Sequence, residues 1–300
     1  MNRNDRLLVE VTVVGKDRKG VVADVTNFIF KNDGNIEQIN QNVISGLFGM
    51  QLEASFHHHD FKKKLFDTEL KTLAKKLHME VKIHYQEPKR LKNIAIFVSK
   101  ESHCLTKLLD AKVTGEINAN IAVIIASDNT TNSIAKKYNI PFYHIIHSRQ
   151  TDAEDEILDI MDRYNVDLIV LGRYMKILTP NFVWRYPDRI INIHPSLLPA
   201  FPGAYAYVQA YERGAKIVGC TAHFVTEDLD QGPIICQESF RVRQGDTVES
   251  IKRRGQKLEA VTLLEAVTLY LENRIELNWG RVLIKDTNRD QEMNYSKVKN

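Results

Sequence analysis

The pattern of hydrophobic and polar positions divides the chain into two segments of different periodicity. Residues 6–20 (RLLVEVTVVGKDRKG) alternate apolar and polar positions before a turn, and residues 21–34 place apolar side chains at helical spacing. Two strand patterns that meet at Gly46, a further amphipathic helix and a last strand (MEVKIHYQ) follow. The order βαββαβ predicts a small ferredoxin-like α+β domain over residues 1–87.

After a charged linker at residues 88–93, the pattern changes to short apolar runs separated by helical stretches, as far as residue 300. The runs NIAIFVS, NIAVIIAS, PFYHII, DLIVLG and IINIH are typical of parallel strands buried on both faces. The later runs IVGCTAHFV and PIICQESFRV predict antiparallel strands at the far side of the same sheet. The second segment is therefore predicted to be a Rossmann-like, mostly parallel α/β domain.

Two helices of the second segment carry start signals. Thr151 and Glu154, in TDAE, have the spacing of a capping box. The run DTVESIKRRGQKLEAVTLLEAVTLYL predicts a long closing helix with Asp246 and Glu249 at its start.

Composition narrows the class of protein without identifying it. A chain of 300 residues with 43% hydrophobic and 26% charged residues is typical of a globular protein of about two domains. A net charge of +3 gives no case for a nucleic-acid or membrane partner. Cys104, Cys220 and Cys236 are far apart, so we expect reduced thiols and a cytoplasmic location instead of disulfides or a zinc site.

The candidate chemistry begins where an apolar strand ends. Asn192 and His194 stand two residues apart, so their side chains point to the same face. If Asp230 of the loop EDLDQGP joins them, the trio suits acyl transfer from an amide-like nitrogen: the amide donates to an oxyanion, and the other two groups move a proton. Each residue also has a structural explanation on its own, as a loop cap, a core histidine or an Asx-turn. For His223, a packing role is equally consistent with the pattern.

A family resemblance adds to this interpretation. Residues 93–285 resemble the folate-dependent formyltransferase domain through DLIVLGRYMKILTPNFV, INIHPSLLPAFPGA, QAYERG and EDLDQGPII. The resemblance implies that Asn192, His194 and Asp230 are the catalytic residues. It also implies a substrate site for the folate made by Met175, Ile177, Leu178, Thr226, Glu227 and Asp228.

The first segment resembles an ACT domain through GKDRKGVVADVTNFI. This resemblance implies an amino-acid effector, for which Asp17, Gly20 and Asn35 are the expected ligand residues, and a homo-oligomer (a dimer or a tetramer). The order of the two domains resembles formyltetrahydrofolate deformylases. It implies hydrolysis of 10-formyltetrahydrofolate to formate and tetrahydrofolate, which balances folate pools and supplies formate for purine synthesis. No metal or redox cofactor is implied.

Two alternatives stay open at this point. The loop after the first strand of the second segment, SKESHCLTKLL, has no glycine with which to cradle the phosphate of an amine acceptor, which favours water. Pro195 and Leu197, in HPSLLP, are closer to transferases that formylate glycinamide ribonucleotide or an amino sugar. A regulatory protein that senses an amino acid without catalysis is the alternative from another class.

Overall fold

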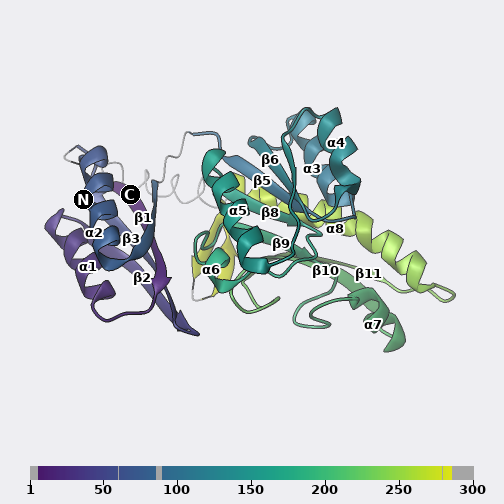
Figure 1. Cartoon of the computed structure of the whole chain (residues 1–300). Helices are drawn as coiled ribbons and strands as arrows, with labels where there is room; N and C mark the ends of the chain where they lie inside the picture. The colour runs from purple at the N-terminus through teal and green to yellow at the C-terminus, as the bar shows by residue number, and fades with distance from the viewer. Residues whose placement is uncertain (1–5, 60, 86–89, 279, 286–300) are drawn as a thin grey trace, which may run out of the picture. The chain divides into compact units, whose positions relative to one another are not determined.

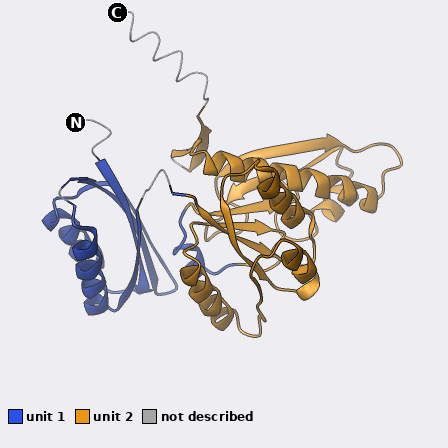
Figure 2. Cartoon of the chain, turned by 90° about the horizontal axis from the view of Figure 1, so that it is seen from above, with its two compact units in different colours: residues 1–90, 178–187 blue, residues 91–177, 188–300 orange. Residues whose placement is uncertain are grey.

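The computed structural model describes residues 6–59, 61–85, 90–278 and 280–285, which form two compact units (Figure 2). Unit 1 comprises residues 1–90 and 178–187, and unit 2 comprises residues 91–177 and 188–300. Residues 88 and 89 of the predicted linker lie outside the described residues, and its last residue, Asn93, begins a strand. Residues 178–187 group with unit 1 although they lie in the middle of the second segment.

Unit 1 has the predicted βαββαβ order. Its elements are β1 (Arg6–Lys16), α1 (Val21–Lys31), β2 (Asn35–Ile44), β3 (Leu47–His57), α2 (Lys63–Leu77), β4 (Met79–Tyr85) and, in the later segment, α6 (Pro180–Val183). The strands lie in the order β2-β3-β1-β4, and each neighbouring pair is antiparallel. The helices α1 and α2 lie side by side against the sheet, and their apolar side chains pack on those of β1 and β3 (Figures 1 and 2).

The register of unit 1 places the expected effector residues far apart. Asn35 pairs with Ser55 of β3, and Ser55 in turn pairs with Leu8 near the start of β1. Asp17 directly follows the other end of β1, where its N–H donates to the carbonyl of Gly46. Leu8 and Asp17 are nine residues apart along the strand, so at about 3.3 Å per residue the two expected positions are about 30 Å apart. A single small molecule therefore cannot contact both residues of one chain.

Unit 2 is built on a seven-stranded sheet in the order β11-β10-β9-β8-β5-β6-β7. Its strands are β5 (Asn93–Val98), β6 (Asn120–Ala126), β7 (Phe142–His144), β8 (Leu168–Gly172), β9 (Ile190–His194), β10 (Ile217–Phe224) and β11 (Ile234–Arg241). The five strands β5 to β9 are parallel, while β10 and β11 are antiparallel additions. The predicted fold class is confirmed, and so are the two antiparallel strands.

The helices cover both faces of this sheet. They are α3 (His103–Thr114), the 3₁₀ helix η2 (Asn129–Thr131), α4 (Asn132–Lys137), α5 (Gln150–Arg163), α7 (Ala206–Glu212) and α8 (Val248–Leu271). Apolar residues of α3 and α8 pack on one face of β5, β6 and β8. The strands β6 and β7 are added on one side of β5, and β8 is then added on its other side. Because crossovers between parallel strands are right-handed, this change of side places α5 on the opposite face of the sheet (Figure 1).

The change in the side on which strands are added defines a switch point between β5 and β8. From β5 the chain proceeds to β6 and β7 on one side, whereas β8 and β9 lie on the other side of β5. In open α/β sheets, ligands bind beyond the carboxyl ends of the strands at such a point. The functional residues of unit 2 are therefore expected at the ends of β5, β8 and β9.

The helix starts differ from the sequence predictions in two places. The capping box predicted at Thr151 and Glu154 is wrong, because α5 begins at Gln150 after Arg149 and its cap makes no side-chain hydrogen bond. The side chain of Gln150 instead donates to the buried carboxylate of Glu154. Helix α8 does have a capping box, but Thr247 and Ser250 form it. The hairpin that follows α8, β12 (Ile275–Asn278) and β13 (Arg281–Ile284), was not predicted.

In the parts of the chain that the structure describes, no helix combines the length and the apolar character that crossing a membrane requires.

The capping box gives a test of α8. Replacing Thr247 by Ala removes the oxygen that accepts from the N–H of Ser250, so we expect the free energy of unfolding to fall by about 1 kcal/mol. Thr247→Ser keeps that oxygen and should change the free energy by only a few tenths of this. Urea unfolding followed by circular dichroism measures both. An equal loss in the two variants would contradict the capping role.

Candidate active site

Strand β9 sets the frame of the site. It pairs with β8 in parallel and with β10 antiparallel, so its side chains lie between two fixed neighbours. The β10 register places His223 opposite Asn192 and Thr221 opposite His194. Side chains at i and i+2 of both strands point to one face, which gathers the four polar side chains at the carboxyl end of β9.

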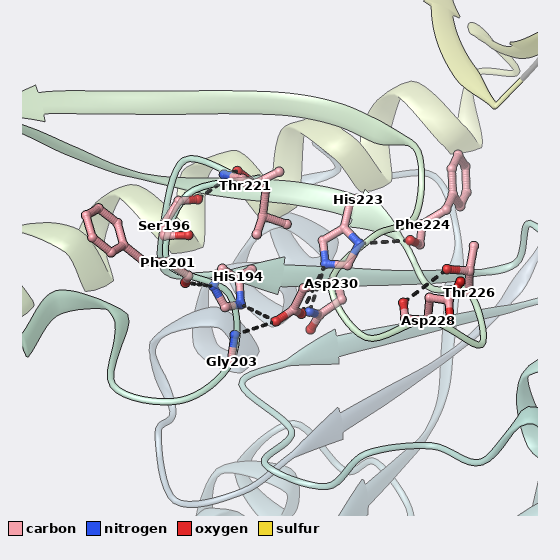
Figure 3. A network of polar contacts seen from close by, with 12 residues as sticks. His194, Ser196, Phe201, Gly203, Thr221, His223, Phe224, Thr226, Asp228 and Asp230 are labelled. Atoms are coloured by element: carbon pink, nitrogen blue, oxygen red, sulfur yellow. Dashed lines mark hydrogen bonds and ion pairs between the residues drawn. The ribbon is translucent and has the colours of Figure 1, made fainter. Parts of the chain in front are cut away.

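Asp230 completes the cluster (Figure 3). Its Oδ2 lies 3.3 Å from Nδ1 of His194 and accepts from the N–H of Gly203 at 2.8 Å. Its Oδ1 lies 3.9 Å from Nε2 of His223. The side chains of Asp230, His194 and His223 are each at most 6% exposed. The structure thus brings together the three residues that the sequence singles out, and adds His223.

The loop that carries Asp230 is shaped by its own residues. Asp230 has a φ of 57°, a left-handed conformation that Asp tolerates better than most residues. Two positions later, Gly232 approaches the strand so closely that a Cβ would overlap the carbonyl of Phe224. The glycine therefore lets this loop turn back onto β10 and hold the carboxylate against β9.

Hydrogen bonds to carbonyl oxygens decide the protonation of both imidazoles. Nε2 of His194 lies 3.0 Å from the carbonyl of Phe201, and a carbonyl only accepts, so this nitrogen carries a proton; Nδ1 faces Asp230 and donates to its carboxylate when a second proton is bound there. Likewise, Nδ1 of His223 donates to the carbonyl of Phe224 at 2.8 Å. In the neutral ring, Nε2 of His223 then accepts from the amide of Asn192 at 3.1 Å. This bond fixes which end of the Asn192 side chain is the donor.

The environment of the cluster favours opposite protonation states for Asp230 and His223. Burial by itself raises the pKa of Asp230, but hydrogen bonds from His194 and Gly203 outweigh it and hold the pKa below its ordinary value. Burial lowers the pKa of His223. At neutral pH, Asp230 is therefore a carboxylate and His223 is neutral. The arrangement offers a base at Asp230 and a neutral amide donor at Asn192.

Two of the expected substrate residues are exposed. The residues Met175 and Ile177 are 56% and 65% exposed, which leaves apolar surface available to a planar ligand. Their backbone is fixed, because the N–H of Met175 donates to Oγ of Ser99 and the carbonyl of Ile177 accepts from Gln150. Leu178 is buried and belongs to the segment that groups with unit 1.

The other three expected substrate residues precede Asp230 on its loop. Thr226 and Glu227 are half-buried, and Asp228 is exposed. The hydroxyl of Thr226 donates to the carbonyl of Asp228, which also accepts from the N–H of Gln231. These bonds hold the loop in one conformation beside the cluster. Substrate contact by these residues stays a prediction.

Sequence reasoning missed the supports of the cluster. Thr221 is fully buried, and its hydroxyl donates to the carbonyl of Ser196 while it accepts from the N–H of Leu198. The carbonyl of Phe201 and the N–H of Gly203 contact His194 and Asp230, respectively. The alternation of Thr221 and His223 mirrors that of Asn192 and His194, and this signal becomes informative only when β10 is known to pair with β9.

Comparisons with known proteins agree with the domain division. Residues 92–267 match the family model of formyl transferases, and residues 7–84 match that of ACT domains. The formyltetrahydrofolate deformylase of Bacillus subtilis is 40% identical over 273 residues, which cover 89% of this chain and 90% of the relative. The chain belongs to the formyltetrahydrofolate deformylase family. The Escherichia coli member is 38% identical over 272 residues, which cover 89% of this chain and 95% of the relative.

Solved structures separate this family from its nearest chemical relatives. A formyltetrahydrofolate deformylase from Pseudomonas syringae matches with a TM-score of 0.65 at 32% identity, covering 93% of this chain and 95% of its own. A glycinamide ribonucleotide transformylase from Symbiobacterium toebii has a TM-score of 0.64 at 36% identity, yet it covers only 68% of this chain and 97% of its own. Membership of the deformylase family therefore rests on both domains together.

The tautomer of His223 can be observed directly. Because burial lowers its pKa, we expect this imidazole to stay neutral at pH 6.5, the ordinary value for histidine, with the proton on Nδ1. Nitrogen NMR of ¹⁵N-histidine-labelled protein between pH 7.5 and 5.5 measures both properties, and His223→Gln identifies the resonance. A proton on Nε2, or a charged ring at pH 7, would show that His223 does not accept from Asn192.

Proposed function

We propose that this chain hydrolyses 10-formyltetrahydrofolate to formate and tetrahydrofolate. The observation that carries the proposal is the pairing of an ionised Asp230 with His194, beside the amide of Asn192 at the carboxyl end of β9. Relatives that are 38–40% identical over 89% of the chain have the name formyltetrahydrofolate deformylase. The chemistry of the cluster suits cleavage of an amide-type bond by water.

The proposed catalytic roles follow from which oxygen of Asp230 already has hydrogen-bond partners. Oδ2 of Asp230 contacts His194 and Gly203, whereas Oδ1 makes no hydrogen bond within the described part of the chain and is the oxygen that accepts a proton. Water loses that proton as its oxygen bonds to the formyl carbon. The amide of Asn192 donates to the oxyanion, in an environment where such a bond is worth more than in water.

Collapse of the tetrahedral intermediate completes the balance. The bond between the formyl carbon and N10 breaks, N10 takes the proton that water supplied through the Asp230–His194 pair, and formic acid leaves and releases its proton to solvent as formate. His194 keeps its Nε2 proton on the carbonyl of Phe201, so the mobile proton is shared on the Nδ1 side. These steps need an acid–base pair and an oxyanion donor, and we propose that no metal or redox cofactor takes part.

The remaining assignments extend the proposal beyond the reaction. We assign the folate to Met175, Ile177 and Leu178 together with the loop of residues 226–228. An amino-acid effector at Asp17, Gly20 and Asn35 needs more than one copy of unit 1, because Asp17 and Asn35 are about 30 Å apart. A homo-oligomer would satisfy that need. We also propose a cytoplasmic location, where the three free cysteines would stay reduced.

Replacing Asp230 by Asn tests the base. The amide cannot take the proton from water, so we expect the rate of formate release to fall by about 100-fold or more. The measurement is formate produced from 10-formyltetrahydrofolate without any amine, and the control is Asp155→Asn, an exposed position on α5 that should keep full activity. Formyl transfer to an added amine, in the absence of free formate, would refute the hydrolase assignment in favour of a transferase.

Replacing Asn192 by Ala tests the oxyanion donor separately. The donor acts on charge that develops in the transition state, so kcat should fall by about 100- to 1000-fold with little change in KM. Steady-state kinetics of formate release, with circular dichroism as a check of folding, gives both constants. A rise in KM at constant kcat would assign Asn192 to substrate binding instead.

A further inference from the structure

The segment of residues 173–179 connects the end of β8 to the start of α6. The structure describes all of this segment, and none of it belongs to a helix or a strand. Strand pairing therefore does not fix its conformation. Its exposed residues Met175 and Ile177 are those that the proposed function assigns to the folate. Such a segment needs other contacts to hold it, because ordering it at the moment of binding would weaken the affinity.

One contact comes from Gln150, the first residue of α5. Its Nε2 donates to the carbonyl of Ile177 at 2.8 Å and to Oε1 of Glu154, also at 2.8 Å. Both partners accept, so an amide turned the other way would place its oxygen against two oxygens. Glu154 is buried and lies one turn further along the same helix. Its carboxyl group thus orients the amide that binds Ile177.

A second contact comes from His147, in the turn before α5. Its Nδ1 lies 3.1 Å from the carbonyl of Ile145, which only accepts, so Nδ1 carries a proton. Burial lowers the pKa of His147, so the ring is neutral at neutral pH and its Nε2 accepts from the hydroxyl of Tyr174 at 2.8 Å. Burial and the charge of Glu154 raise the pKa of Tyr174, so this hydroxyl keeps the proton that the bond requires.

The two contacts have the same separation in the sequence. His147 contacts Tyr174 and Gln150 contacts Ile177, each across 27 residues. Two pairs with one separation mean that the turn and the segment run side by side in the same direction. One short stretch, residues 147–150, thus holds residues 174–177 at both ends.

The strands of the sheet fix both stretches in turn. The N–H of Ile145 donates to the carbonyl of Ala126 at the end of β6 at 2.9 Å, which ties the turn to the sheet. The N–H of Met175 donates at 2.9 Å to Oγ of Ser99, which directly follows β5. That oxygen lies 2.6 Å from Oγ of Ser127. Rigid elements therefore position the turn and the middle of the segment, as a preorganised binding site requires.

We propose that the turn between β7 and α5 is a positioning element for the folate, with His147 and Gln150 as its positioning residues. The identity of the ligand rests on the proposed function. Neither residue is placed against the formyl group, since each acts through Tyr174 or Ile177. They hold the segment in its binding conformation before the substrate arrives, so they contribute to affinity and not to the rate of bond cleavage.

Replacing Gln150 by Met tests this role. Methionine has a similar length but no donor, so the carbonyl of Ile177 is released. We expect KM for 10-formyltetrahydrofolate to rise about tenfold while kcat changes by less than about twofold. Calorimetry with tetrahydrofolate should show the same loss of affinity. The matched control is Thr151→Val, which removes a polar group from the next, exposed position of α5 and should change none of these constants.

Replacing Tyr174 by Phe tests the contact of His147 separately. The change removes the hydroxyl but keeps the ring, whose centroid lies 5.2 Å from that of Phe97 in an edge-on arrangement. KM should again rise with kcat nearly constant, and thermal unfolding checks that each variant is folded. If Gln150→Met does not fold, the constants of Tyr174→Phe decide for or against the positioning element.

The contrary outcomes are specific. Unchanged KM and tetrahydrofolate affinity in a folded Gln150→Met would overturn the role of Gln150, and the same result in Tyr174→Phe would overturn that of His147. A fall in kcat at constant KM, or an equal rise of KM in Thr151→Val, would overturn the inference as a whole. Tetrahydrofolate binding is measured without turnover, so an unaltered chain that binds it but releases no formate would refute the hydrolysis and not the positioning role.

Discussion

The register between β9 and β10 is the constraint on which the site depends. A parallel strand that ends with Asn192 and His194 presents both side chains on one face, but nothing in β9 itself fixes their rotation or protonation. The antiparallel partner supplies His223 opposite Asn192 and Thr221 opposite His194. A shift of one residue would send these partners to the other face of the sheet. The backbone pairing of β9 with β10 therefore fixes which side chains support Asn192 and His194.

Two of the buried carboxylates of unit 2, those of Asp230 and Glu259, have opposite surroundings. Asp230 keeps one oxygen without a hydrogen bond in the described chain, which suits a group that must accept a proton. Both oxygens of Glu259 face donors, which suits a group that must hold its charge. The difference follows from position, since Asp230 lies on a loop beyond β10, while Glu259 lies inside a helix between elements that end at the switch point. A buried charge suits proton transfer at Asp230 and holds neighbouring elements together at Glu259.

The parts of this fold that sequence predicts well are those in which one physical rule dominates. Apolar runs predict the buried parallel strands, and the period of two brings Asn192 and His194 together. The start of α5 was mispredicted because Gln150 reaches the buried Glu154, so tertiary burial overrides a local capping pattern. The support by His223 was left open because it depends on strand register. The burial of Glu259 was not predicted, because its partners lie about 50 to 150 residues away in the sequence.

The loop between β9 and α7 has a consequence for how this chain can diverge. Within a few residues, this loop supplies the carbonyl of Phe201 to one imidazole and the N–H of Gly203 to one carboxylate, and the first turn of α7 supplies the hydroxyl of Tyr207 to another carboxylate. Two of these three contacts come from the backbone, which has a positive φ at both Phe201 and Gly203, 52° and 79°. A single inserted or deleted residue would put all three out of step at once. The length of this stretch is therefore constrained, and so is the residue type at Gly203, where a side chain would be strained.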